Sequence, residues 1–282
     1  MTDPRLVRHS SPLLGRRRPG VLANRSGDAV FLGYHSVVED GPPFLSIAPA
    51  RFAAQLEVLR RAGYAAGTLA TLEGLAERRS AARPRAFLTF DDGYVDNFTH
   101  VLPLLREYGY TGIFFILPSR VDEGGSLDWD GVTREHAAHP AVMRSMDWTM
   151  VEQMADAGME FGSHTVSHPS LPALDDDELA DELLDSRRRI AAKLGRCDTL
   201  AYPFGHWDAR VEAAAAAAGY RFAFTLPFGA QTTASQLSIP RVTIDHRDDA
   251  RRFRIKLSPP VRRALFSRAR SAGRRLRDLR AG

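Results

Sequence analysis

The sequence predicts an α/β fold, a distorted or incomplete (β/α) barrel of about seven parallel strands. Continuous apolar runs of strand length recur along the chain, and helical patterns alternate with them. Strands of a parallel sheet are buried on both faces, so they appear as unbroken apolar runs. Strands that alternate with helices favour β/α units. With 282 residues and 44% hydrophobic residues, the chain can form one such barrel.

Seven apolar runs predict the strands. The first, AVFLGYH, is followed by AFLTF and GIFFIL, and each is bounded by polar or turn-forming residues. The remaining runs have the same character. In order, the seven predicted strands are residues 29–35, 86–90, 112–117, 159–164, 199–205, 221–226 and 237–244.

Four helices are predicted between these strands, at residues 50–63, 149–158, 175–194 and 208–219. The first two end at glycines, which suit the left-handed position after a helix. The third begins with acidic residues, which suit the positive end of the helix dipole. The fourth contains an alanine run, and alanine is the strongest helix former.

The connection over residues 119–146 has no clear periodicity and contains Trp129. Long segments without regular structure in compact domains are often lids or binding loops. We therefore expect this segment to lie over the site, with a solvated insertion as the alternative.

Composition divides the chain into three parts: a basic, loosely ordered arm at 1–27, a folded domain at 28–246 and an Arg-rich helical tail at 247–282. The tail has thirteen basic and three acidic residues, a balance of +10, so the rest carries −6 of the net +4. The single cysteine, Cys197, excludes an intramolecular disulfide. No apolar run reaches membrane-spanning length and no signal peptide is convincing, so we expect a cytoplasmic protein.

Two short motifs indicate metal-assisted hydrolysis. TFDDGY places Asp91 and Asp92 at the end of an apolar run, and SHTVSH places His164 and His168 four residues apart. In a helical turn this spacing would point both imidazoles the same way. Two histidines and one carboxylate leave coordination positions open, as catalytic metal sites do. The second carboxylate stays free as a base. Turn-forming Asp and Gly and a solvated helix face are the ordinary alternatives.

These motifs, followed by AYPFG at residues 201–205, resemble the first three motifs of the polysaccharide deacetylases, the NodB-like carbohydrate esterases. The similarity extends from about residue 31 to residue 244. GYHSVV near the start is similar to the exopolysaccharide N-deacetylase branch. The resemblance implies that residues 28–246 form the catalytic domain.

The resemblance also implies roles for individual residues. Asp92, His164 and His168 would hold one divalent metal ion, most plausibly zinc, although iron, cobalt or nickel also suit such a set. Asp91 would be the general base. The backbone amide of Phe204 would face the oxyanion.

Three further assignments are expected from the motifs and their flanks. Family members often carry an arginine at the start of the third motif, where this chain has Ala201 and Tyr202, so Arg241 is the candidate that orients the base. His35 is the candidate general acid, with His246 and His206 as alternatives. Tyr94, Pro203 and Trp129 are expected to bind substrate. The residues at or just past the C-terminal ends of predicted strands, where β/α barrels build their sites, are His35, Asp91, Asp92, His164, Pro203 and Arg241.

The resemblance implies hydrolysis of N-acetyl groups from N-acetylhexosamine units of a glycan, with release of acetate. A deacetylase-like amidohydrolase acting on a small cyclic amide or ureide is the alternative among enzymes. A non-catalytic carbohydrate-binding relative is the alternative from another class. The predicted basic helix at 258–282 would suit peripheral contact with an anionic membrane, or packing on the barrel. Nucleic acid is not expected as a partner.

Overall fold

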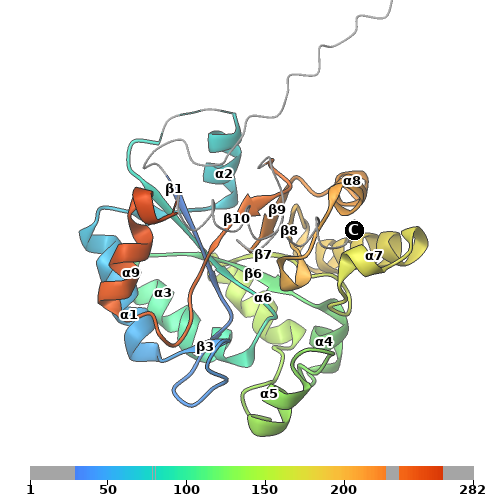
Figure 1. Ribbon diagram of the computed structural model, residues 1–282, viewed down its shortest axis with the longest axis horizontal. Coiled ribbons are helices and arrows are strands. Elements are labelled where there is room, and N and C mark those ends of the chain that lie inside the picture. Colours follow the sequence, from blue (N-terminus) through green and yellow to red (C-terminus); the bar gives the residue numbers. More distant parts are fainter. Residues whose placement is uncertain (1–28, 78, 80, 227–234, 263–282) are drawn as a thin grey trace, which may run out of the picture.

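The computed structural model of this protein describes residues 29–77, 79, 81–226 and 235–262. Within them a parallel sheet is almost closed into a barrel and surrounded by helices (Figure 1). Hydrogen-bonded neighbours follow the order β10-β9-β8-β7-β6-β5-β1-β11, with β4 beside β5. The predicted distorted barrel is therefore confirmed. The strands of this sheet are β1 (Ala29–Tyr34), β4 (Ala65–Ala66), β5 (Arg85–Phe90), β6 (Gly112–Ile116), β7 (Glu160–Ser163), β8 (Thr199–Ala201), β9 (Phe222–Thr225), β10 (Ile239–Pro240) and β11 (Val242–Thr243).

The two end strands of the sheet follow one another in the chain, with only Arg241 between them. β10 pairs with β9, and β11 pairs with β1. The Arg241 amide donates to the Thr225 carbonyl at 3.1 Å, and the Ile244 amide donates to the Gly33 carbonyl at 2.9 Å. The predicted strand 237–244 thus pairs with β9 through its first half and with β1 through its second half, on the two sides of the gap in the barrel. It also carries the buried Arg241 side chain into the barrel.

Helices occupy the predicted positions and several others. Those predicted are α1 (Pro49–Arg61), α6 (Trp148–Asp156), α7 (Asp176–Leu194) and α8 (Ala209–Ala217). Those not predicted have eight residues or fewer, too few turns to show a helical period. They are α2 (Leu69–Ala76), α3 (Leu102–Tyr108), α4 (Pro118–Glu123) and α5 (Thr133–Ala138), whereas α9 (Ala250–Leu257) lies in the predicted helical tail at 247–282. Helical turns also occur at Asn97–Val101, Leu171–Ala173 and Pro203–Gly205.

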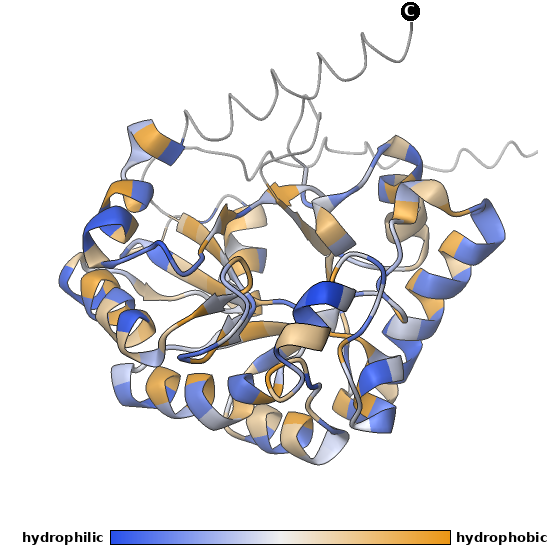
Figure 2. Ribbon diagram, turned by 60° about the horizontal axis from the view of Figure 1, so that its bottom comes forward, coloured by the Kyte–Doolittle hydropathy of each residue, from blue (hydrophilic) through white to orange (hydrophobic). Residues whose placement is uncertain are grey.

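The core has two layers because successive strand residues face opposite sides of the sheet. In β5, Leu88 faces the helices while Phe87 joins the aromatic-rich cluster inside the barrel. Figure 2 shows the surrounding helices with hydrophobic and hydrophilic sides. The interior is narrow: a side chain at Gly162 would place a Cβ 2.3 Å from Thr199 Oγ1 and 2.7 Å from Phe115 Cε1. Glycine at this position allows the metal-motif strand β7 to pack against the aromatic interior.

The segment 119–146 is not the structureless loop that was predicted. It begins within α4 and contains α5, and short antiparallel bridges join Ser126 to Arg144 and Tyr94 to Ser145. Leu127, Val132 and Met143 form a small buried cluster with Tyr94. The six-residue helices are too short to show periodicity in sequence, and the segment folds because it has its own core.

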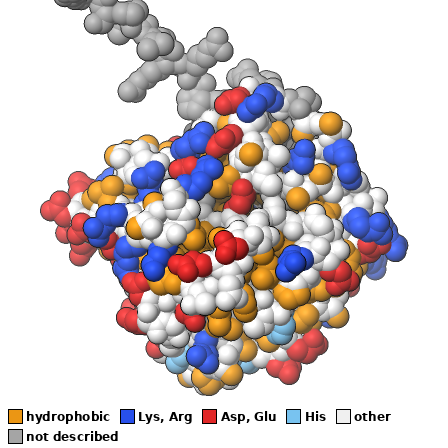
Figure 3. Space-filling view, turned by 180° about the vertical axis from the view of Figure 1, so that it is seen from behind, with side chains coloured by type: hydrophobic (Ala, Val, Ile, Leu, Met, Phe, Trp, Pro, Cys, Tyr) orange, Lys and Arg blue, Asp and Glu red, His pale blue; other side chains and the backbone are white. Residues whose placement is uncertain are grey.

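The arm at 1–27 and most of the predicted basic helix at 258–282 lie outside the described residues, and with them the expected membrane contact. The beginning of the 247–282 segment forms α9, which packs against α1 and buries Phe253 and Leu257. In the described part of the chain, every helix is too short or too polar to cross a bilayer. Figure 3 shows basic and acidic side chains side by side over much of one face.

A shorter pair of parallel strands, β2 (Ser36–Val37) and β3 (Ser46–Ile47), lies beyond the end of β1. The Ser36 amide donates to the Leu45 carbonyl at 2.9 Å. The pair fixes the chain just after His35, at the C-terminal rim of the barrel.

Candidate metal centre and active site

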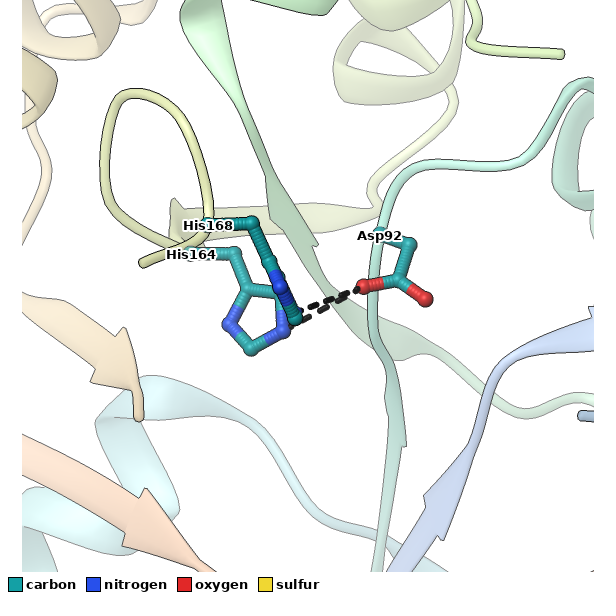
Figure 4. Close-up of side chains that lie close together, drawn as sticks. All are labelled: Asp92, His164 and His168. Atoms are coloured by element: carbon teal, nitrogen blue, oxygen red, sulfur yellow. Dashed lines mark ion pairs between the residues drawn. The ribbon is translucent and has the colours of Figure 1, made fainter. Parts of the chain in front are cut away.

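Asp92, His164 and His168 converge at the C-terminal rim of the barrel (Figure 4). Asp92 follows β5, and His164 follows β7. Asp92 Oδ1 lies 3.3 Å from His164 Nε2 and 3.6 Å from His168 Nε2. One ligand atom from each residue lies within 4.8 Å of the others, and all three side chains are buried. The structure therefore brings together the three residues predicted to hold a metal.

The two histidines do not share a helical turn, so the predicted local geometry was wrong. β7 ends at Ser163, and the following residues form an irregular loop. Thr165 and His168 have φ angles of 72° and 70°, in the left-handed region. Each such residue costs on the order of 1–3 kcal/mol and persists only where its surroundings hold it. The histidine spacing is therefore set by a strained loop.

Hydrogen bonds within the loop hold part of this conformation. The Thr165 amide donates to Ser163 Oγ at 3.0 Å, and the His168 amide donates to Thr165 Oγ1 at 3.1 Å. The small hydroxyl residues of SHTVSH thus cap the turn between the two imidazoles.

The donor set fits a divalent metal ion. His164 Nδ1 lies 2.8 Å from the Ala201 carbonyl, which can only accept, so Nδ1 donates and Nε2 is the ring nitrogen that faces Asp92. Asp92 Oδ1 is buried and has no hydrogen-bond partner among the described residues. A buried carboxylate oxygen without a partner is costly, and a cation between it and the two imidazoles would satisfy it.

Asp91 lies beside this set in a different environment. Arg241 Nη1 and Nη2 donate to Asp91 Oδ1 and Oδ2, each at 2.7 Å, and Nη1 also donates to Thr89 Oγ1 at 2.9 Å. Arg241 is completely buried and lies near the rings of Phe115 and Phe224. The arginine therefore has the position expected of a residue that orients Asp91.

Charges in the site shift the pKa values of its carboxyl groups. Burial alone would raise the pKa of Asp91, but the Arg241 guanidinium and the nearby imidazoles outweigh burial and lower it. Burial would also raise the pKa of Asp92, and the neighbouring histidines, His164 foremost, lower it. Both carboxyl groups are thereby held in the ionised form that a ligand and a proton acceptor require.

The pKa values of His164 and His168 shift in opposite directions. Burial, together with the charge of His164, lowers the pKa of His168 to about 3. Burial would lower the pKa of His164 as well, but the Asp92 and Asp91 carboxylates outweigh it and raise that pKa. The neutral His168 has a lone pair available for a metal at neutral pH.

Only one of the three candidate acids lies beside Asp91. His35 Nε2 is 3.9 Å from Asp91 Oδ2, and Asn97 Nδ2 donates to the His35 carbonyl at 2.9 Å. His246 is exposed and its ring contacts the Pro43 carbonyl. His206 is also exposed and contacts Ser170 Oγ at 3.2 Å. The rim therefore favours His35 on proximity.

Comparisons with known proteins show the family to which the chain belongs. A family model described as polysaccharide deacetylase matches residues 78–223, slightly more than half of the chain. The chain belongs to the polysaccharide deacetylase family. YxkH of Bacillus subtilis (strain 168), whose name refers to polysaccharide deacetylation, is 26% identical over 203 residues, which are 71% of this chain and 64% of YxkH.

Two further similarities are to a curated protein and to a solved structure. The chitooligosaccharide deacetylase of Sinorhizobium fredii (strain NBRC 101917 / NGR234) is 26% identical over 145 residues, 50% of this chain and 57% of that protein. The chain thus spans less than two thirds of both curated relatives. The Streptococcus pyogenes deacetylase PplD, solved with acetate, superposes with a TM-score of 0.70 at 22% identity, covering 82% of this chain and 98% of PplD. That structure supports the barrel fold.

Two aromatic side chains of this member of the polysaccharide deacetylase family flank His168. The ring centroids of Trp129 and His168 lie 4.3 Å apart, and those of Phe204 and His168 lie 4.6 Å apart. Gly131 lies against the Phe204 ring, where a Cβ would be 3.4 Å from Cε1. The segment 119–146 therefore reaches His168, one of the three candidate metal ligands, as expected of a segment that lies over the site.

Two residues expected to bind substrate are buried. The Tyr94 side chain has no exposed surface and its hydroxyl lies 3.5 Å from Met143 Sδ. The expectation that Tyr94 contacts substrate was wrong, because its ring fills the small core beneath segment 119–146. Pro203 is also buried, in the turn that gives Phe204 a φ angle of 57°. Its contribution is to the backbone near the site.

Two residues that hold the His35 segment were not predicted from the sequence. Asp96 is buried, accepts from Ser36 Oγ and from the Val37 amide, each at 2.7 Å, and burial raises its pKa. Asn97 holds the His35 carbonyl. Their position directly after TFDDGYV is the only sequence signal, and it is indistinguishable from ordinary turn chemistry.

Proposed function

We propose that this polysaccharide deacetylase removes N-acetyl groups from N-acetylhexosamine units of an oligo- or polysaccharide, with one divalent metal ion. One observation carries the proposal: Asp91, paired with Arg241 and next to His35, lies beside the Asp92–His164–His168 set. Amide hydrolysis requires a carboxylate that is not a metal ligand beside a metal site with open coordination positions, and Asp91 has that place. The name of the Sinorhizobium relative supports an N-acetylated glycan as substrate.

Each residue has a defined task in this proposal. A divalent ion on Asp92, His164 and His168 would polarise the acetyl carbonyl and raise the acidity of water. Asp91 takes the proton from the attacking water, while Arg241 holds both carboxylate oxygens in place. His35 gives a proton to the departing amine. The Phe204 amide donates to the oxyanion, and Trp129 contacts the sugar.

The metal is tested first. We expect the purified chain to retain about one divalent ion, zinc being the most plausible, and His164→Ala or His168→Ala to abolish its retention, because two ligands do not hold such an ion tightly. Metal content after dialysis, measured by elemental analysis, checks this. The exposed His206→Ala serves as control. Full metal occupancy in both ligand variants would refute the proposed site.

The substrate is tested by acetate release. Chito-oligosaccharides, partly acetylated glucosamine polymers and small acetamides would be compared, with chelator-treated protein as control. Acetate from the glycans that disappears on chelation and returns with metal is the expected result. Hydrolysis of small amides alone would contradict a glycan substrate.

We expect His35→Gln to lower kcat on an N-acetylated glycan about 100-fold, because proton donation to the amine contributes about 10²–10⁴ in such reactions. The same variant should lose much less activity on an acetyl ester with a good leaving group, which departs without a proton. His246→Gln and His206→Gln are the controls. Equal losses on both substrates would show that His35 does not act as the acid.

A further inference from the structure

We infer that Glu182, on α7, is a positioning residue that holds the loop between the two histidines in its metal-ligating conformation. The inference rests on the proposed metal-dependent function. Glu182 lies on α7, and the hydrogen bonds of its carboxylate go to Val166 and Ser167 of the loop.

The Glu182 carboxylate binds the loop at three points. Oε2 accepts from the Val166 amide at 2.7 Å and from the Ser167 amide at 3.0 Å, and Oε1 accepts from Ser167 Oγ at 2.5 Å. Val166 and Ser167 are the two residues immediately before His168. A charged acceptor makes stronger hydrogen bonds than a neutral one, so the contact is well suited to hold backbone in place.

The loop is also held on its other sides. Ser119 Oγ donates to the Val166 carbonyl at 2.5 Å, and Ser163 Oγ donates to Ser186 Oγ of α7 at 2.8 Å. Ser186 in turn contacts the Tyr220 hydroxyl at 3.0 Å. Glu182 differs from these partners because, among the described side chains, it alone accepts from the Val166 and Ser167 amides in the middle of the loop.

Holding is needed because this loop is strained. Thr165 and His168, on either side of the residues bound by Glu182, have left-handed backbone conformations that L-residues rarely adopt. Without Glu182, the chain has alternatives in which Thr165 and His168 relax. The apparent affinity for a metal falls in proportion to the fraction of molecules whose loop is in the ligating conformation.

The test compares Glu182→Ala, Glu182→Gln and Asp181→Asn in the full chain, with zinc as the probe. Asp181 is exposed on the same helix, so its variant matches the loss of one negative charge. Zinc dissociation constants are measured by competition with a chromophoric chelator. Amide hydrogen exchange of residues 163–168 is measured on the metal-free protein.

We expect Glu182→Ala to weaken zinc binding about tenfold to 100-fold, the range for residues that orient metal ligands. The Val166 and Ser167 amides should exchange faster. Glu182→Gln, whose amide oxygen can accept from both amides, should stay within about threefold of the unsubstituted protein. Asp181→Asn should leave both readouts unchanged.

Equal zinc affinity and equal exchange in Glu182→Ala and Asp181→Asn would overturn the inference. If Glu182→Ala does not fold, Ser167→Ala, which removes only the contact to Oε1, replaces it, with a smaller loss expected and no change again contradicting. Absence of zinc binding by the unsubstituted protein would instead refute the proposed function, and the exchange data would still report whether Glu182 holds the loop.

Discussion

Asp91→Asn is expected to lower kcat about 10³-fold while the protein keeps its metal, because removal of a general base costs about 10²–10⁴. The adjacent variant Asp92→Asn should lose both activity and metal. The two carboxylates separate because Asp92 has a φ angle of 71°, which turns its side chain toward the imidazoles. Asp91 instead points to Arg241.

Measuring kcat and metal content on the same preparations checks this pair of variants. In Asp91→Asn the new side chain would keep one oxygen for Arg241 but present an amide to the second guanidinium nitrogen. A thermal unfolding curve must therefore show that the variant is folded at the assay temperature. Near-normal turnover by Asp91→Asn would place the base elsewhere. Loss of metal in Asp91→Asn but not in Asp92→Asn would reverse the proposed roles.

Much of this barrel could be predicted from the sequence because its strands are buried on both faces. Both faces of the strands formed by AFLTF and GIFFIL are buried, so nearly all their residues are apolar. That apolar pattern alone identifies β5 and β6. The end of the sheet could not be predicted in the same way. The sequence of residues 237–244 predicts one strand. In the structure Arg241 separates it into β10, which pairs with β9, and β11, which pairs with β1.

The candidate site was predictable in composition and less so in geometry. Asp92, His164 and His168 were brought together as expected, since they follow the C-terminal ends of strands. The expectation that the two histidines share a helical turn was wrong, and the loop between them is instead hydrogen-bonded to α7 through partners 16 and 23 residues along the chain, which a local pattern does not show. Glu182 itself lies among six other acidic residues from 175 to 185, and nothing in the sequence distinguishes it from them.

Arg241→Met is expected to destabilise the fold by about 3–5 kcal/mol, because it leaves the buried Asp91 carboxylate without its cation. Methionine fills a similar volume and makes no charged hydrogen bond. Denaturant unfolding of the metal-free protein measures the loss. The double variant Asp91→Asn/Arg241→Met removes both charges, so it should be destabilised by clearly less than the sum of the two single variants. Additivity within about 0.5 kcal/mol would show that the pair is not coupled.

The same variant predicts a change with pH whose sign follows from the Asp91 pKa. Arg241 lowers that pKa in the folded protein, so the pair's stabilisation is present above the ordinary carboxyl pKa and is lost as pH falls through the lowered folded value. Without Arg241, the largest influence left on the pKa of Asp91 is burial, which raises it against the imidazoles of His164 and His35. The neutral acid then becomes the favoured buried form, and the variant's stability deficit should shrink from about pH 8 to about pH 5.

The acid limb of kcat/KM for Arg241→Met should move to higher pH for the same reason, since a protonated Asp91 cannot accept a proton. Arg241→Lys, which keeps the charge but not the two-pronged contact, should shift the limb less. An unshifted acid limb in Arg241→Met would mean that Asp91 does not titrate as the essential base.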